Sequence, residues 1–316
     1  MLLDVQRLFH SFEKRLSRFD PDSELSRFNT RQADVFKASL TLLDAVEAAL
    51  WAAQTTAGLY DPTIIGALER AGYDRSFEKI GQSEGHVNKI ARSLPQSYPR
   101  GRGNFTSLSL ERNEGGTTEP NNCTFRSIHL NRAWREIYKP RGLRLDLGGI
   151  GKGWTVDRVA DRLQGLGPFL LNAGGDIFAY QSPPGQKGWS IDLIHPLKSD
   201  LLMAKLKLHH RALATSTIAK RRWQRHGRIM HHLIDPRTGQ PAQTDVVSVS
   251  VIAHRTMMAE VYAKVALILG MMDGLAYLNR LPGVEGLIFT KAGEIQYTNG
   301  FEELLIRLEP SGYAKE

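Results

Sequence analysis

The sequence predicts an α+β fold in which antiparallel or mixed sheets pack against helices. Apolar residues recur at helical spacing in three separated segments, residues 1–16, 37–56 and 256–270. From residue 124 onward the chain is rich in short strand-like segments that do not alternate regularly with helices, which argues against a parallel βαβ architecture. The composition, 41% hydrophobic and 23% charged, is that of an ordinary globular protein, and 316 residues suffice for one large or two modest domains.

The N-terminal part supplies helices and one irregular segment. The first helix is followed by a turn that Asp22 or Ser23 can cap. The helix predicted over 37–56 ends near Gly58, because glycine readily adopts the conformation required just beyond a helix end. Residues 82–122 carry scattered Gly, Ser, Asn and Pro without periodicity, so we expect an irregular insertion there.

The C-terminal part supplies the strands and the remaining helices. We interpret a segment ending at Asp146 as a strand that leads into a helix over 151–165, and residues 169–180 as one further strand. A hairpin is expected around Asn131–Arg132. The other predicted strands cover 189–195, 204–210, 211–217, 245–254 and 285–293, and the last helices cover 256–270 and 273–281.

The net charge of +8 leaves nucleic acid, acidic lipid and anionic small molecules as ligand classes. Basic residues are dispersed except in KRRWQRHGR (220–228). This cluster fits, in decreasing order of expectation, a solvated helix end, a phosphate-binding patch or a nucleic-acid contact. The basic residues lack interleaved aromatic residues and a known nucleic-acid motif, so we expect no nucleic-acid partner.

Cysteine content and hydropathy indicate which cellular compartment to expect. Cys123 is the only cysteine, which excludes a disulfide framework within the chain and a cysteine-based metal site. No run reaches the roughly 18 apolar residues of a membrane span. The N-terminus lacks the basic region and cleavage site of a signal peptide, so the chain as given is expected in the cytoplasm.

LDLGGIGKGWTVDRVADRL (145–163) is the strongest local signal for ligand binding. Four glycines follow Asp146 within eight residues, and Lys152 adds a positive charge where the predicted helix begins. Glycine lets the backbone approach a ligand closely, and free N–H groups at a helix start favour phosphate. The spacing matches neither nucleotide-binding glycine motif. A tight strand-to-helix turn with an incidental lysine is the alternative.

HHLIDPRTGQP (231–241) places two adjacent histidines before an Asp-Pro turn that ends at Gly239. Either His231 or His232 can serve as base, nucleophile or metal ligand, although two histidines alone are weak grounds for zinc. A turn with one packed and one exposed histidine is the alternative.

Two shorter stretches fit a ligand-binding surface less specifically. AGLYDPTIIGAL (57–68) sets Tyr60 beside Asp61, where an aromatic ring can stack on a planar ligand, but an Asp-Pro helix start is the commoner explanation. LLNAGGD (170–176) ends a strand with small residues that can lie against a ligand or another strand.

The helix predicted over 256–270 is apolar almost all round, yet it carries Glu260 and Lys264 four residues apart. The commoner explanation is an ion pair on a solvent-facing edge, which contributes about 0.2–0.5 kcal/mol. The alternative is a pair of charged groups aimed into a polar site between packed elements.

Taken in order, these motifs resemble those of the ApbE family, the FAD:protein FMN transferases. The matching pieces run from about residue 8 to residue 270 and are LSRFDPDSELSRFN, GLYDPTI, LDLGGIGKGWTVDRV, LLNAGGDI, ATS, HHLIDPRTGQP and the helix that carries Glu260 and Lys264. DLGGIGKG and HLIDPRTG are the most specific. The resemblance implies one ApbE-like domain over 1–316, related to the T-fold, with the insertion at about 82–122.

The resemblance also implies a reaction and a set of site residues. Members of the family bind FAD and, with magnesium, split its pyrophosphate, so that FMN is joined through a phosphoester to a Thr or Ser of a target flavoprotein and AMP leaves. Gly149 falls where a backbone carbonyl ligates the metal, and His232 matches the histidine proposed to act in flavin transfer. The implied FAD-contacting positions are Phe19, Leu59, Tyr60, Asp61, Asp146, Lys152 and Ile234.

Three departures from the family pattern qualify this expectation. The family's metal-binding Asp and Thr or Ser are Glu260 and Lys264 here; glutamate can still ligate magnesium, whereas a protonated lysine has only donors. Either Lys264 replaces part of the metal's charge and pairs with Glu260, or metal-dependent turnover is lost, so bound Mg²⁺ is not assured. ATSTIAKRR stands where the family reads TSGDY. The Gly-Thr strand that usually precedes the first helix in the family is lacking. If translation starts at an upstream codon that adds a signal peptide, the expected compartment becomes the periplasm or cell envelope.

We therefore expect an FMN transferase with a modified cation site, in which His232 and Lys264 act in catalysis and Gly149 and Glu260 are the remaining metal ligands. FAD is its substrate, and an acceptor flavoprotein carrying a Thr or Ser is its partner. The alternatives are an FAD-binding protein without catalysis and an FAD pyrophosphatase that yields FMN and AMP.

Overall fold

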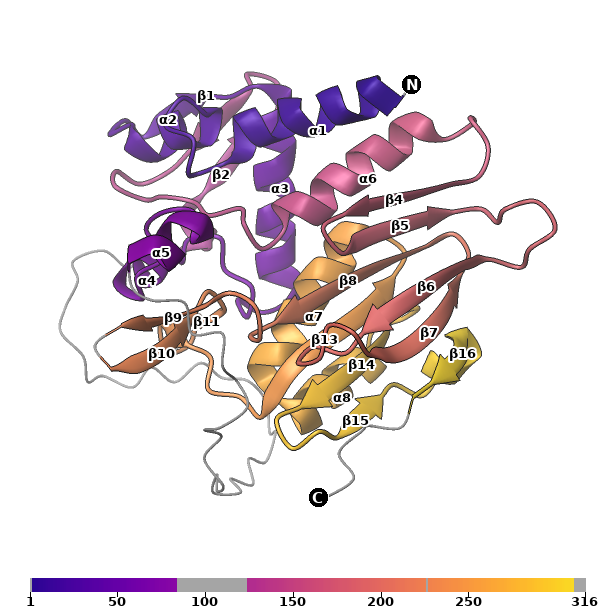
Figure 1. Cartoon of the computed structure of the whole chain (residues 1–316). Coiled ribbons are helices and arrows are strands. Elements are labelled where there is room, and N and C mark those ends of the chain that lie inside the picture. The colour runs from indigo at the N-terminus through magenta and orange to yellow at the C-terminus, as the bar shows by residue number, and fades with distance from the viewer. Residues whose placement is uncertain (1, 84–123, 226, 310–316) are drawn as a thin grey trace.

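A central antiparallel sheet with helices on one face and a smaller sheet on the other forms the body of the molecule (Figure 1). The computed structural model describes residues 2–83, 124–225 and 227–309. The α+β prediction is confirmed. Within the described ranges, no helix combines the length and the apolar character needed to cross a membrane.

The central sheet has six antiparallel strands in the order β15-β14-β13-β8-β5-β4. Every residue of β13 is buried, because both faces of the sheet are covered. The strands are β4 (Phe169–Ala173), β5 (Asp176–Tyr180), β8 (Arg211–Thr217), β13 (Val246–Ala253), β14 (Glu285–Thr290) and β15 (Ile295–Tyr297).

Three helices cover one face of this sheet, and a three-stranded sheet of order β16-β7-β6 covers the other. The helices are α6 (Gly151–Leu163), α7 (Thr256–Leu269) and α8 (Met271–Asn279). The smaller sheet consists of β6 (Trp189–Ile194), β7 (Leu202–Leu208) and β16 (Leu305–Leu308), which follows the short 3₁₀ helix η2 (Phe301–Leu304).

The N-terminal helices extend the helical layer at the side of α6 (Figure 1). They are α1 (Leu2–Leu16), α2 (Glu24–Thr30) and α3 (Leu40–Thr55), accompanied by a small sheet of β1 (Val35–Lys37), β3 (Glu136–Tyr138) and β2 (His129–Asn131) and by the 3₁₀ helix η1 (Phe125–Ser127).

A second cluster of short elements borders the same layer (Figure 1). It contains α4 (Ile65–Arg70), α5 (Phe77–Ser83), the hairpin β9 (Arg222–Arg225) with β10 (Arg228–His231), and the two-residue strands β11 (Ile234–Asp235) and β12 (Gln240–Pro241). The short strands escaped prediction, because two to four residues are too few for a periodicity to be read.

The long periodic helices and most strands were predicted correctly. Ser23 caps α2 by accepting a hydrogen bond from the Ser26 N–H, and Gly58 adopts a φ of +85° beyond α3. The helix expected from residue 37 begins at Leu40, because Ser39 is its N-cap. β2 and β3 form the expected hairpin, with its turn over 132–135. The expected insertion lies outside the described residues from residue 84 on.

Two strand predictions were wrong. The segment ending at Asp146 is not a strand: the backbone of Leu145 exchanges hydrogen bonds with the Asn29 side chain (2.8 and 2.9 Å), and the Asp146 N–H donates to Pro62 O (2.8 Å). Residues 169–180 form two strands, β4 and β5, because Gly174 and Gly175 adopt φ angles of +65° and +100° and reverse the chain.

The basic cluster 220–228 was expected first as a helix end, but its described residues instead include β9 and the first residue of β10, which pair as a hairpin. Trp223 anchors this hairpin, since its buried side chain donates a hydrogen bond to Ala71 O (2.9 Å) and stacks on Tyr73. The hairpin is thereby fixed beside α4.

The N-terminal ends of α6 and α7 cross at close range. A Cβ added to Gly153 would lie 2.7 Å from the Met257 backbone nitrogen and 2.7 Å from the Thr256 carbonyl group. The Asp157 carboxylate accepts hydrogen bonds from the Thr256 and Met257 N–H groups (2.8 and 3.0 Å). These bonds satisfy N–H groups at the start of α7 that have no partner within the helix.

We expect Gly153→Ala to destabilise the protein by roughly 1–3 kcal/mol, because the added methyl group has no space between the two helix backbones. Urea unfolding measures the loss. Gly151→Ala is the matched control, since the nearest atom to its added Cβ is Leu147 Cβ at 3.9 Å. Equal stability of the two variants would contradict the packing argument.

Candidate active site

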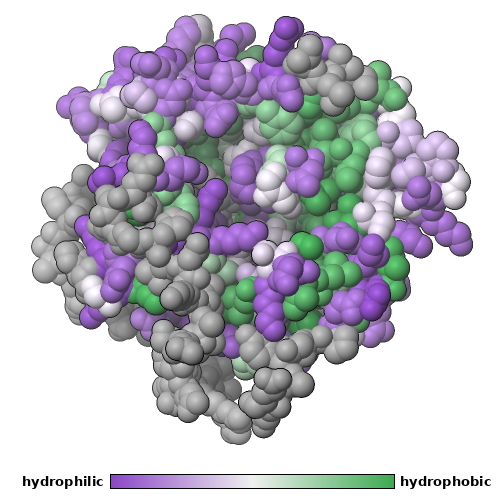
Figure 2. Space-filling view, in the orientation of Figure 1, coloured by the Kyte–Doolittle hydropathy of each residue, from purple (hydrophilic) through white to green (hydrophobic). Residues whose placement is uncertain are grey.

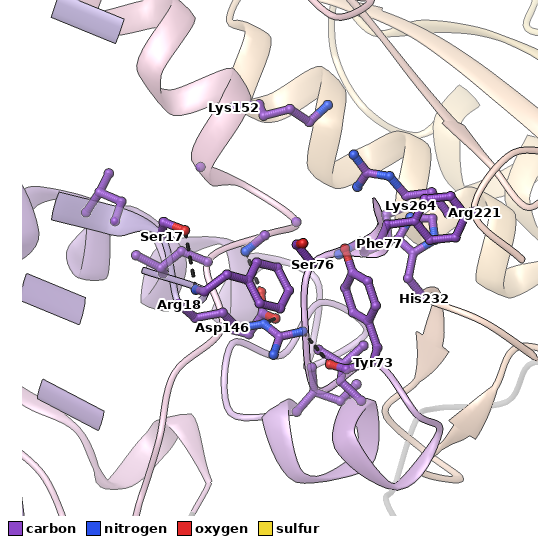
Figure 3. A pocket seen from close by; sticks show the side chains of 18 of the residues that line it. Ser17, Arg18, Tyr73, Ser76, Phe77, Asp146, Lys152, Arg221, His232 and Lys264 are labelled. Atoms are coloured by element: carbon purple, nitrogen blue, oxygen red, sulfur yellow. Dashed lines mark hydrogen bonds and ion pairs between the residues drawn. The ribbon is translucent and has the colours of Figure 1, made fainter. Parts of the chain in front are cut away.

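A cavity of about 630 Å³ opens where the N-terminal helices, the start of α6, the segment before β9 and α7 meet. Figure 2 shows hydrophilic side chains around a hollow on this face of the molecule. In the close view, Arg18 and Asp146 lie on one side, Arg221, His232 and Lys264 lie on the other, and Lys152 reaches in from α6 (Figure 3). The volume is within the range of small-molecule sites, roughly 300–1,000 Å³.

The glycine-rich segment before α6 is held in place by Asp146. Its buried carboxylate accepts a short hydrogen bond from the Gly148 N–H and pairs with Arg18 Nε (2.6 Å). Arg18 in turn donates to Tyr73 O (2.8 Å) and lies over the rings of Phe19 (4.1 Å) and Tyr73 (5.0 Å). One guanidinium thus links the glycine loop to the aromatic wall of the cavity.

Lys152 connects the loop to two buried carboxylates. Its Nζ lies 2.6 Å from Asp176 Oδ2 and 4.0 Å from Glu260 Oε1. Burial acts to lower the pKa of Lys152, but the carboxylates of Glu260 and Asp176 outweigh it and raise that pKa. Burial and the Asp176 carboxylate raise the pKa of Glu260 to about 7, although Lys152 and the Gly153 N–H oppose the shift.

Glu260 and Lys264 do not form the solvent-edge ion pair that was the commoner expectation. Glu260 is buried, and its Oε2 accepts a hydrogen bond from the Gly153 N–H (2.8 Å). Lys264 lines the cavity, where a side chain at Gly149 would overlap its Nζ. Within the described ranges, no ion pair of 4.0 Å or less joins the two residues, so the expected pairing is also wrong.

The two histidines of the HH turn face different surroundings. His232 lines the cavity, and its buried Nδ1 has no hydrogen-bond partner in the described residues. Burial, together with the charges of Arg221 and Lys264, lowers the pKa of His232 well below the usual histidine value. The imidazole is therefore neutral at physiological pH. His231 is buried away from the cavity lining and contacts Ala242 O through Nε2 (3.2 Å). His232 is thus the histidine that faces the site.

The turn after the histidines is built by Asp235. Its carboxylate accepts bonds from the Arg237 backbone and guanidinium, and Gly239 adopts the expected left-handed φ of +65°. In the same way, Asp61 accepts hydrogen bonds from the Thr63 N–H (2.8 Å) and hydroxyl (2.7 Å) ahead of α4. The Asp-Pro turn explanation therefore holds for the backbone at Asp61, while the side chain still borders the cavity.

The structure brings together residues that the sequence analysis selected from distant segments. All seven implied FAD-contacting residues line the cavity, as do Gly149, His232 and Lys264; Glu260 lies behind Lys152 and is not part of the lining. Sequence reasoning missed Arg18, Tyr73, Phe77 and Arg221, which also line it. Arg18 adjoins Phe19 in a matched motif and Arg221 lies in the basic cluster, but no sequence signal marks Tyr73 or Phe77.

Comparison with known proteins identifies relatives along nearly the whole chain. The model of the ApbE family matches residues 3–288. A Treponema pallidum protein named FAD:protein FMN transferase is 34% identical over 183 residues, which are 52% of this chain and 50% of that protein. A Vibrio cholerae protein of the same name is 26% identical over 285 residues, which are 88% of this chain and 77% of that one. The chain spans about half the length of the Treponema relative, as it does for a Klebsiella pneumoniae relative (48%).

Solved structures show the same fold. The ApbE protein of Thermotoga maritima superposes with a TM-score of 0.74 at 22% identity, covering 97% of this chain and 91% of that one. The flavin transferase ApbE of Vibrio cholerae gives a TM-score of 0.70 at 23% identity, covering 96% and 90%. The ApbE-like fold predicted from the motifs is confirmed.

We expect His231 to make stability depend on pH. Burial lowers its pKa to about 4, whereas an unfolded histidine has a pKa of about 6.5, so the unfolded chain binds more protons between these values. Stability should fall as the pH drops through this window, and His231 alone should account for about 2 kcal/mol between about pH 7.5 and pH 5. Urea unfolding at both pH values measures the loss.

His231→Gln should lose less stability than the wild type over this pH range, because Gln can still donate to Ala242 O but does not titrate. The exposed His129 offers a control: His129→Gln should follow the wild type. Identical pH dependence of the wild type and His231→Gln would show that His231 does not carry the effect.

Proposed function

This chain belongs to the ApbE family, and on that basis we propose that it transfers the FMN part of FAD to a Thr or Ser hydroxyl of an acceptor flavoprotein. The product is a phosphoester, and AMP leaves. The name FAD:protein FMN transferase, carried by relatives from several bacteria, supports the proposal. A cavity with aromatic walls at one side and basic groups at the other supports it as well.

The proposed FAD contacts divide by chemistry. Phe19, Leu59, Tyr60 and Ile234 offer apolar and aromatic surface to the planar rings, since stacking tolerates any flat π system. Asp61 borders the same surface and can accept a hydrogen bond. Around the diphosphate, Lys152 and Arg221 supply positive charge, and Asp146 holds the glycine loop whose N–H groups can approach phosphate oxygens.

In the proposed reaction the acceptor oxygen attacks the phosphorus of the FMN half. The bond from that phosphorus to the bridging oxygen breaks, the bridging oxygen leaves with AMP, and a new bond joins phosphorus to the Thr or Ser oxygen. His232 takes the hydroxyl proton on its neutral imidazole and can pass it to solvent or to the departing AMP. Phosphoryl transfer otherwise needs mainly positioning and charge neutralisation.

The observation that carries the proposal is the position of His232. A neutral imidazole with a buried, unpartnered Nδ1 lies in a cavity whose charged groups, Arg221 and Lys264, are close enough to lower its pKa. An unpaired polar atom in such a place is costly unless a ligand uses it.

We expect wild-type protein to label an acceptor with FMN and to release an equal amount of AMP from FAD. The acceptor is a flavoprotein domain with a Thr at its flavinylation site, and its Thr→Ala variant is the negative control. His232→Asn should lower the transfer rate by about 10²–10⁴-fold while FAD binding persists, because only the proton acceptor is removed. In-gel flavin fluorescence and AMP quantification measure the two products.

The neighbouring His231→Gln is the matched control and should keep the wild-type rate. Release of free FMN and AMP without acceptor labelling would indicate a pyrophosphatase instead. FAD binding without any AMP release would indicate a carrier or sensor.

A further inference from the structure

The Lys264 ammonium occupies the space beside the backbone of Gly149. A Cβ at Gly149 would overlap Lys264 Nζ and would lie 2.8 Å from its Cε and 3.2 Å from Tyr60 Cε2. The Tyr60 ring lies under the ammonium, with 5.5 Å between Nζ and the ring centroid. Lys264 is therefore packed against the very residue whose carbonyl the family resemblance assigns to a metal ion.

The residues at this place do not fit a magnesium site. Magnesium requires oxygen ligands in near-octahedral geometry, whereas a protonated lysine offers only donors. Glu260 Oε2 already accepts the Gly153 N–H, and Oε1 faces Lys152 at 4.0 Å. In residues 2–83, 124–225 and 227–309, no three His, Cys, Asp or Glu side chains cluster closely enough to hold a metal ion.

Burial outweighs the neighbouring charges in the empty protein, so the pKa of Lys264 lies below the usual lysine value. Burial lowers the pKa of Lys264, and Lys152 lowers it further, but the carboxylates of Asp146 and Glu260 oppose this shift. A bound diphosphate would add negative charge on the open side of the cavity and would favour the ammonium again. Because Lys264 lines the cavity beside Gly149, its side chain is placed to meet an anion.

We propose that the Lys264 ammonium, in place of a divalent metal ion, binds the FAD diphosphate beside Gly149. The test of this inference by FMN transfer rests on the proposed function, whereas the test by FAD binding does not. As the bond between phosphorus and bridging oxygen breaks, Lys264 donates hydrogen bonds to the phosphate oxygens on which negative charge grows. Transfer by this chain then requires no Mg²⁺.

The first experiment compares wild-type protein in excess EDTA and in Mg²⁺. FAD affinity, followed by flavin fluorescence, and FMN transfer to the acceptor domain should each agree within about twofold between the two conditions, since no metal takes part. A wild-type enzyme that loses transfer in EDTA and regains it with Mg²⁺ would overturn the inference while leaving the proposed function intact.

The second experiment removes the charge. Lys264→Gln should weaken FAD binding in EDTA by roughly 10- to 100-fold, the size expected for a hydrogen bond to a charged group. Lys207→Gln, at an exposed position of β7 outside the cavity, controls for the change in net charge and should bind FAD as the wild type does. Equal FAD affinity of Lys264→Gln and wild type would overturn the inference.

A third variant tests whether a metal can return. Lys264→Thr supplies a hydroxyl oxygen in place of the ammonium, so FAD binding by this variant should become tighter when Mg²⁺ is added, whereas wild-type binding should not. If wild-type protein transfers no FMN under either condition, the proposed function fails. The binding measurements on the wild type and the two Lys264 variants then still decide the role of Lys264.

Discussion

The close crossing of α6 and α7 at their N-terminal ends is the contact on which the site depends. Gly153 leaves room for the two backbones to touch, and the Asp157 carboxylate accepts hydrogen bonds from the N–H groups that begin α7. Glu260, one turn further along α7, accepts a hydrogen bond from the Gly153 N–H. A second turn along α7 then carries Lys264 to Gly149 in the loop before α6. The same packing that joins the two helices therefore sets the distance between a glycine loop and a buried ammonium.

Charge balance in the cavity follows from that geometry. The carboxylates of Asp146 and Asp176 each have a basic partner at 2.6 Å, Arg18 and Lys152. Buried ion pairs add little stability, because desolvation offsets much of their attraction. Arg221 and Lys264 have no ion pair within 4.0 Å among the described residues, so the surplus of positive charge faces the open side. An arrangement of this kind is costly for the empty protein and favourable once an anion enters.

Much of the fold was predictable because its longer elements carry a clear periodicity, as in α3 and α7, or turn residues with one function, as at Ser23 and Gly58. The strand expected at Asp146 failed because a side chain, Asn29, takes the hydrogen bonds that a neighbouring strand would make. The motif residues of the cavity could be selected by resemblance. The contact between Lys264 and Gly149 could not be, nor could the choice between His231 and His232, because both depend on how separate segments pack.

Two of the three departures from the family motifs meet in one place. Lys264 stands where the family resemblance implies a metal-binding oxygen, and Arg221 belongs to the segment ATSTIAKRR, which stands in place of the usual motif. Both line the same cavity, and both lower the pKa of His232. A lysine carries a single positive charge, whereas a magnesium ion carries two. In the proposed site, Arg221, which directly precedes the anchored β9–β10 hairpin, supplies the second positive charge beside that of Lys264.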